Sequence, residues 1–166
     1  MFTPIRQVLP SRRDLRNRRL VVVDIENVIG GAALNAEAVT WARRAIEDLC
    51  RPADSDHVVI GTSHVGLLAV GTTWSGPRHV VGSGPDGADL ALLDVLEENI
   101  ATRFGETILV SGDGIFTTAL TGLAAAGVQT TVIAHPDGLS RRLRMTAHRV
   151  LPLAEHYQPG TLGGAA

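Results

Sequence analysis

One short stretch restricts the fold of this chain more than any other: three consecutive valines, Val21 to Val23, followed at once by polar residues. An unbroken run of β-branched apolar residues is typical of a strand that is buried on both faces. Asp24, Glu26 and Asn27 come where such a strand would emerge from the core. In open α/β sheets, ligands bind outside the carboxyl ends of the strands. The stretch therefore predicts a buried strand with a candidate site at its end.

Strand and helix patterns alternate along the rest of the chain. We expect strands at residues 57–62, 79–81, 107–110, 128–134 and 148–153. Helices are expected at residues 36–50, 63–70, 87–104 and 140–147, with a further helix of small residues that ends at Ala126. Asn35 is placed to cap the first helix, and Gly127 to close the small-residue helix. This alternation predicts an α/β fold, a three-layer sandwich with a mostly parallel central sheet.

Composition indicates one globular domain. The 166 residues are 45% hydrophobic and 19% charged, and no apolar run approaches the ~20 residues that cross a bilayer. The single cysteine, Cys50, ends a helical pattern and is expected to be a small core residue. These features predict a cytoplasmic protein without a membrane span. We divide the chain into a weakly ordered basic arm (residues 1–19), a domain (20–153) and a flexible tail (154–166).

Charge is distributed unevenly. Residues 1–20 contain six arginines and one acid, whereas the remainder has nine arginines and sixteen acids. Basic arms of this kind often contact nucleic acid, and a solvated leader is the alternative. All fifteen basic residues are arginine, and the chain has no lysine.

A second carboxylate is expected at the same edge of the sheet. On a helical wheel, Asp89 points the same way as Leu93 and Leu96, so it should face the sheet, whereas Asp94 lies on the polar side with the solvent. The alternative is local capping, with Asp86 as N-cap and Asp89 as the third helical residue.

A third carboxylate follows the strand at residues 107–110. The segment from Ser111 to Gly114 presents Asp113 at the carboxyl edge, and the Ser111 hydroxyl can hydrogen-bond neighbouring carboxylates. Several like charges within a few ångströms are costly unless a cation neutralises them. Oxygen ligands of this kind suit Mg²⁺ or Mn²⁺.

Two protein families share parts of this pattern. Gly82 to Gly87 fits the glycine fingerprint of dinucleotide-binding domains, although Asp86 and Asp89 would repel a pyrophosphate. Asp24-Ile25-Glu26 and Gly112-Asp113-Gly114 resemble two motifs of haloacid-dehalogenase-type phosphatases. That family has aspartate where Glu26 stands and usually relies on a lysine, which this chain lacks.

A third resemblance is more extensive. The segments Val21–Asn27, Gly87–Asp94 and Leu109–Phe116, in this order, resemble those of NYN domains, which belong to the PIN-like nucleases. The likeness extends over about residues 20–153. It implies a PIN-like fold and a divalent-metal-dependent endoribonuclease that hydrolyses RNA phosphodiester bonds. Relatives of this kind often form homodimers.

The resemblance also implies the site residues. Asp24, Asn27, Asp89 and Asp113 match its catalytic positions, and the three aspartates would hold one or two Mg²⁺ or Mn²⁺ ions. Glu26, Asp94 and Ser111 are lesser candidates, and the Glu26 side chain could instead point away. Phosphate contacts would come from arginines on the arm and near the last helix: Arg12, Arg13, Arg16, Arg18, Arg19, Arg141, Arg142 and Arg144.

One residue departs from that family's pattern. Ile115 stands where a second aspartate usually follows Asp113. This motivates an alternative function, a PIN-like module that binds RNA or a protein partner with weakened or absent cleavage.

Overall fold

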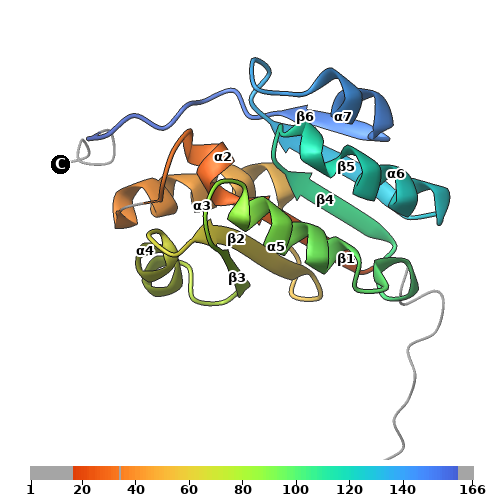
Figure 1. Cartoon of the computed structure of the whole chain (residues 1–166), viewed down its shortest axis with the longest axis horizontal. Coiled ribbons are helices and arrows are strands. Elements are labelled where there is room, and N and C mark those ends of the chain that lie inside the picture. Colours follow the sequence, from red (N-terminus) through yellow and green to blue (C-terminus); the bar gives the residue numbers. More distant parts are fainter. Residues whose placement is uncertain (1–16, 34, 161–166) are drawn as a thin grey trace, which may run out of the picture.

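The protein is a three-layer α/β sandwich built on six parallel strands (Figure 1). The computed structural model describes residues 17–33 and 35–160. The sheet has the strand order β3-β2-β1-β4-β5-β6, and every neighbouring pair is parallel, so the predicted fold class is confirmed. The strands are β1 (Arg19–Asp24), β2 (His57–Ser63), β3 (Arg78–Gly82), β4 (Glu106–Val110), β5 (Gln129–Ala134) and β6 (Arg149–Pro152).

Helices cover both faces of the sheet (Figure 1). One face is covered by α2 (Ile25–Ile29), α3 (Ala36–Cys50) and α4 (Leu67–Thr73). The other is covered by α5 (Gly87–Leu96), α6 (Thr117–Ala125) and α7 (Arg141–Thr146), with two short 3₁₀ helices, η1 (Ile100–Thr102) and η2 (Gly114–Phe116).

The central strand β1 is buried on both of its faces. Val21 and Val23 pack into the apolar cluster beneath α3, whereas Leu20 and Val22 pack into the cluster beneath α5 and α6. Successive side chains of a strand point to opposite faces, so an unbroken apolar run fits a strand between two helical layers. This is the arrangement that the valine run predicts.

Helix α3 has the predicted bounds. The Asn35 side chain caps it by accepting a 2.8 Å hydrogen bond from the Ala38 N–H. The helix ends at Cys50, which is buried as expected. Burial raises the pKa of the Cys50 thiol to about 12, which is consistent with a core residue rather than a nucleophile.

Two predicted helices have other bounds, and the helix expected at residues 63–70 is α4, Leu67–Thr73, because β2 extends to Ser63. The helix expected at residues 87–104 ends at Leu96, because Asn99 adopts a left-handed conformation (φ 54°) and the chain continues as η1. Ile100 and Phe104 still reach the core from this bent segment, which explains the continuous apolar pattern. The short helix α2, directly after β1, was not anticipated.

The last described residues pack against the domain. Residues 153–158 have no helix or strand, but Tyr157 packs against the apolar cluster and its ring lies 5.8 Å from that of Trp41. Further on, the Gly160 N–H donates to Glu37.

Most of the predicted arm lies outside the described residues, which begin at Asn17. No helix within residues 17–33 and 35–160 is long and apolar enough to cross a membrane.

Candidate functional site

Asp24 is the last residue of β1 and the N-cap of α2. It is only 5% exposed. Its Oδ1 accepts a hydrogen bond from the Asn27 N–H at 3.1 Å, and its Oδ2 accepts one from the Ser111 hydroxyl at 2.9 Å. The sheet order reverses between β1 and β4, so Asp24 lies at the switch point where open α/β sheets bind ligands.

Asn27 connects the ends of these two strands. Its backbone N–H holds Asp24, and its side-chain Oδ1 accepts a 3.0 Å hydrogen bond from the Gly112 N–H, just beyond β4. The backbone of Asn27 thus helps to orient the Asp24 carboxylate, and its side chain holds the segment after β4.

Asp89 reaches the site from the first turn of α5. A Cβ on Gly82 would lie 1.7 Å from the Gly87 carbonyl oxygen, so only glycine allows the start of α5 to approach the end of β3 so closely. Asp86 occupies the N-cap position with φ 58°, but its side chain makes no capping hydrogen bond. The capping-box explanation of Asp86 and Asp89 is therefore not supported.

Asp113 follows β4 in the turn before η2. Its backbone N–H donates to the Ser111 hydroxyl at 3.2 Å, and its Oδ1 accepts from the Ile115 N–H at 2.9 Å. Asp113 is exposed, whereas Asp24 is buried. The Ser111 hydroxyl thus connects the buried carboxylate to the turn that presents the exposed one.

Glu26 turns into the same region, so the idea that it points away is wrong. Its Oε1 accepts hydrogen bonds from the Ser63 N–H at 2.9 Å and from the Ser63 hydroxyl at 2.5 Å, at the end of β2. A cavity of about 240 Å³ lies at this carboxyl edge of the sheet. Its lining includes Asn27, Ser63 and five carboxylates, which belong to Asp24, Glu26, Asp86, Asp89 and Asp113.

Two carboxyl groups of this cavity, those of Asp24 and Asp89, have a raised pKa. Burial, followed by the negative charge of Asp89, raises the pKa of Asp24 to about 7, against the hydrogen bonds donated by Asn27 and Ser111. The pKa of Asp89 is also raised, first by burial and then by the charges of its acidic neighbours, although its hydrogen bond with Asp24 opposes this. The cavity is therefore a site of unfavourable negative charge.

The donor set of the cavity suits an oxygen-preferring divalent cation such as Mg²⁺ or Mn²⁺. The arrangement of the side chains is less favourable to metal binding than their chemistry. In the described part of the chain, no group of three or more His, Cys, Asp or Glu side chains is arranged so that it could hold a metal ion. Cation binding would therefore require a rearrangement of the carboxylates that line the cavity.

Other predicted residues lie outside the cavity lining. Asp94 is on the exposed side of α5, as the helical wheel indicates. Ser111 is buried behind Asp24 and supports it.

The predicted arginines are divided between the two edges of the sheet. Arg18 and Arg19 lie at the start of β1, on the opposite edge from the cavity, and Arg19 is bound to Asp56 and to two backbone carbonyls. The start of α7 lies beside the Asp113 turn, because the Ser140 N–H donates to the Gly112 carbonyl at 2.8 Å. The exposed arginines of α7 are Arg141, Arg142 and Arg144, while Arg12, Arg13 and Arg16 lie outside the described residues.

Sequence reasoning missed two polar residues of the cavity lining, Ser63 and Asp86. Ser63 follows the predicted strand at residues 57–62, so its position at the carboxyl edge was a usable signal. Asp86 was expected to be a helix cap rather than a site residue, and the left-handed conformation that it adopts without a capping hydrogen bond has no signal in the sequence.

Fold and site together define a class: a parallel α/β sandwich with an acidic cavity at the switch point of its sheet. Among solved structures, the chain resembles a protein of unknown function from Vibrio parahaemolyticus, with 18% identity and a TM-score of 0.57, over 87% of this chain and 96% of that one. At this identity the likeness shows the shared fold. No protein-family model matches the sequence, and no curated protein matches it.

Proposed function

We propose that this protein is a divalent-metal-dependent endoribonuclease of the NYN, PIN-like kind, which works in the cytoplasm. The observation that carries the proposal is the meeting of Asp24, Asp89 and Asp113 in one cavity at the switch point, from three separate segments. The raised pKa of Asp24 supports it, because clustered carboxylates at such an edge are typical of functional sites. The order of motifs that resembles NYN domains supports the same activity.

Each residue has a distinct part in this proposal. Asp24, Asp89 and Asp113 would hold Mg²⁺ or Mn²⁺, which supplies an activated water and stabilises negative charge on the scissile phosphate. Ser111 and the Asn27 backbone fix the Asp24 carboxylate, and the Asn27 side chain fixes the turn that carries Asp113. Ser63 fixes Glu26 on the wall beside β2. Asp113 is exposed and would be accessible to the RNA phosphate.

Arginines would supply the phosphate contacts. Arg141 and Arg142 are suited to this because they begin α7, which is hydrogen-bonded to the Asp113 turn. The arm leaves the domain at the amino end of β1, about 17 Å from Asp24 at ~3.3 Å per strand residue. Arginines of the arm would add phosphate contacts, and binding should weaken steeply with salt.

The proposal is tested by incubating single-stranded RNA with the protein and Mn²⁺, beside the variants Asp24→Asn and Asp113→Asn. We expect the wild type to cleave and both variants to lose at least about 100-fold in rate, since each loses a metal-holding carboxylate. Asp94→Asn, on the exposed side of α5, is the matched control and should cleave normally. RNA binding by wild type and variants, with none of them cleaving, would exclude the enzyme.

A second candidate function is a PIN-like module that binds RNA or a protein without cutting. Ile115 favours it, because this residue packs against an apolar cluster where the resembled family has a carboxylate. Ile115→Asp separates the two candidates. If cleavage by the wild type is weak for lack of this carboxylate, the variant should cleave faster in Mn²⁺. A phosphatase would instead hydrolyse small phosphoesters, which the same assay can include.

A further inference from the structure

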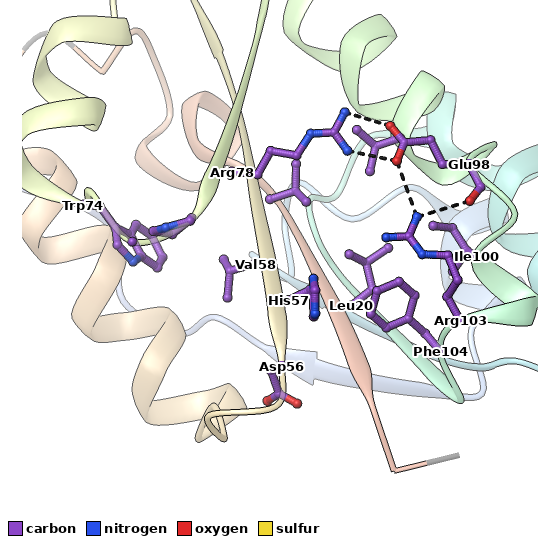
Figure 2. Close-up of a pocket in the computed structure, with 14 residues that line it drawn as sticks. Leu20, Asp56, His57, Val58, Trp74, Arg78, Glu98, Ile100, Arg103 and Phe104 are labelled. Atoms are coloured by element: carbon purple, nitrogen blue, oxygen red, sulfur yellow. Dashed lines mark hydrogen bonds and ion pairs between the residues drawn. The ribbon is translucent and has the colours of Figure 1, made fainter. Parts of the chain in front are cut away.

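A second pocket lies at the opposite edge of the sheet from the acidic cavity. It has a volume of about 410 Å³ and is lined by residues at or near the starts of the strands, among them Leu20, His57 and Arg78 (Figure 2). Its floor is apolar, because Leu20, Val59 and Phe104 belong to the core cluster beneath α5. The volume is within the ~300–1,000 Å³ of small-molecule pockets.

Arginines gather on one side of this pocket. Arg78 forms two hydrogen bonds with the Glu98 carboxylate, of 2.9 and 2.7 Å, and Arg103 approaches the same carboxylate at 3.6 Å. Figure 2 shows the three side chains meeting above Ile100 and Phe104. A guanidinium carries five N–H donors, and Glu98 takes two of those of Arg78, so donors remain for a ligand.

Two guanidinium groups lie close to the Phe104 ring. The guanidinium carbons of Arg18 and Arg103 each lie 5.2 Å from the centre of its ring. His57 meets the ring edge-on at 5.3 Å and is 2.6 Å from Arg18 through its Nε2. Burial and then the charges of Arg18 and Arg103 lower the pKa of His57, so the imidazole is neutral near pH 7 and the positive charge comes from the arginines.

The balance of charge around this pocket is positive. The Asp56 carboxylate is already bound by Arg19 and the Ala53 N–H, and its side chain is only 1% exposed. Glu98 is the remaining carboxylate of the lining, opposed by Arg78 and Arg103 within the lining and by Arg18 beside it. The excess is two positive charges in a protein whose net charge is −2.

We propose that this pocket, the amino-edge pocket, binds a small organic phosphate monoester, with the phosphate on Arg78 and Arg103 and an aromatic or apolar body on the floor. A phosphate dianion matches the excess of two positive charges. Guanidinium groups bind phosphate oxygens through paired hydrogen bonds. An RNA chain fits this pocket less well, because α5, which lines the acidic cavity at its start and this pocket at Val95, carries Asp94 on its exposed side.

Glu98 occupies the arginines when no ligand is bound. It competes with the phosphate for the same donors, so ligand binding requires Arg78 and Arg103 to exchange Glu98 for the phosphate at least in part. Removal of the Glu98 charge should therefore strengthen binding, although it breaks the same ion pair as removal of Arg78 does. A purely structural ion pair would not give opposite results for its two partners.

The test is calorimetric titration of the full chain in EDTA, with adenosine 5′-monophosphate (AMP) as the probe. EDTA removes divalent metals, so the result does not depend on the acidic cavity or on the proposed nuclease activity. AMP is expected to bind with a dissociation constant below about 1 mM. Adenosine and inorganic phosphate, each lacking one half of the probe, should bind at least about tenfold more weakly.

Four variants complete the experiment. Arg78→Gln and Arg103→Gln should each weaken AMP binding about tenfold or more, as expected for loss of a charge-assisted hydrogen bond. Glu98→Gln should tighten it. Arg44→Gln, which removes an exposed arginine of α3 outside the pocket lining, is the matched control and should leave it unchanged.

Three results would overturn the proposal. They are absence of saturable AMP binding, equal binding of inorganic phosphate and AMP, and AMP binding that is unchanged in Arg78→Gln and Arg103→Gln. The last result would place the nucleotide elsewhere, such as on the basic arm.

Discussion

The side-chain oxygen of Asn27 accepts a 3.0 Å hydrogen bond from the Gly112 N–H, which joins the carboxyl ends of β1 and β4. Gly112 has little room to move, since even a Cβ there would lie 2.4 Å from the Gly138 carbonyl oxygen. The turn that carries Asp113 is therefore held between two fixed segments. The spacing of Asp113 from Asp24 depends on this amide side chain together with the Ser111 hydroxyl, which contacts both residues.

We expect Asn27→Ala to lower the free energy of unfolding by about 1–3 kcal/mol, because it leaves the buried Gly112 N–H without its partner. RNA cleavage should fall as well, since the Asp113 turn is released. Urea denaturation measures the first effect. Asp94→Ala, at an exposed site, should change stability by less than about 0.5 kcal/mol. Equal stability of Asn27→Ala and the wild type would show that the hydrogen bond contributes nothing.

Asp24→Asn should stabilise the metal-free protein at alkaline pH. The pKa of Asp24 is raised to about 7 in the fold, above its ordinary 3.8. The folded state therefore favours the protonated carboxyl, and this contribution to stability is present below pH 4 and lost as the pH rises through 7. The asparagine does not titrate and can accept the bond from the Asn27 N–H.

Thermal unfolding in EDTA between pH 5 and pH 8 measures this difference. The advantage of Asp24→Asn over the wild type should grow across that range, by on the order of 1–3 kcal/mol at pH 8. A constant difference between the two proteins would mean that Asp24 is ionised throughout.

Mn²⁺ should stabilise the wild type against heat. Binding to the folded state alone contributes about 2.7 kcal/mol when the free metal exceeds its dissociation constant 100-fold. Asp89→Asn should abolish most of this shift, whereas Asp94→Asn on the same helix should retain it, because only Asp89 lines the cavity. Differential scanning fluorimetry with and without Mn²⁺ makes the comparison. Equal shifts in both variants would remove Asp89 from the metal site.

Gly82→Ala should destabilise the protein by about 1–3 kcal/mol or more, the usual range for overpacking. The new methyl group would collide with the Gly87 backbone, and α5 would have to move away from β3 together with Asp89. Gly71→Ala in α4 is the control, because no atom lies within 4 Å of its Cβ position. It should stabilise the helix by about 0.5–1 kcal/mol. Denaturation of both variants tests the pair, and similar behaviour of the two would contradict the close contact.

The elements that sequence predicts well have strong local causes. The valine run specifies a strand buried on two faces, and Asn35 fixes the start of α3 through its own side chain. The convergence of Asp24, Asp89 and Asp113 was predictable because parallel strands bring their carboxyl ends to one edge.

The features that were missed depend on contacts between distant segments or on unusual backbone conformations. Asn99 ends the α5 segment by a left-handed conformation that asparagine adopts only occasionally. Glu26 faces the cavity because Ser63, 37 residues away, binds it. The ability of the cavity to bind a metal ion depends on side-chain positions at the ångström scale, which no sequence pattern specifies.

The strand order also has a consequence for synthesis on the ribosome. β1, β2 and β3 leave the ribosome first and can pair with one another, but the second edge of β1 stays open until β4 has been made. The acidic cavity is therefore complete only after Asp113 has emerged from the ribosome. A nascent chain that stops before β4 would expose an apolar strand edge, which is prone to aggregation, and would be unable to assemble the site.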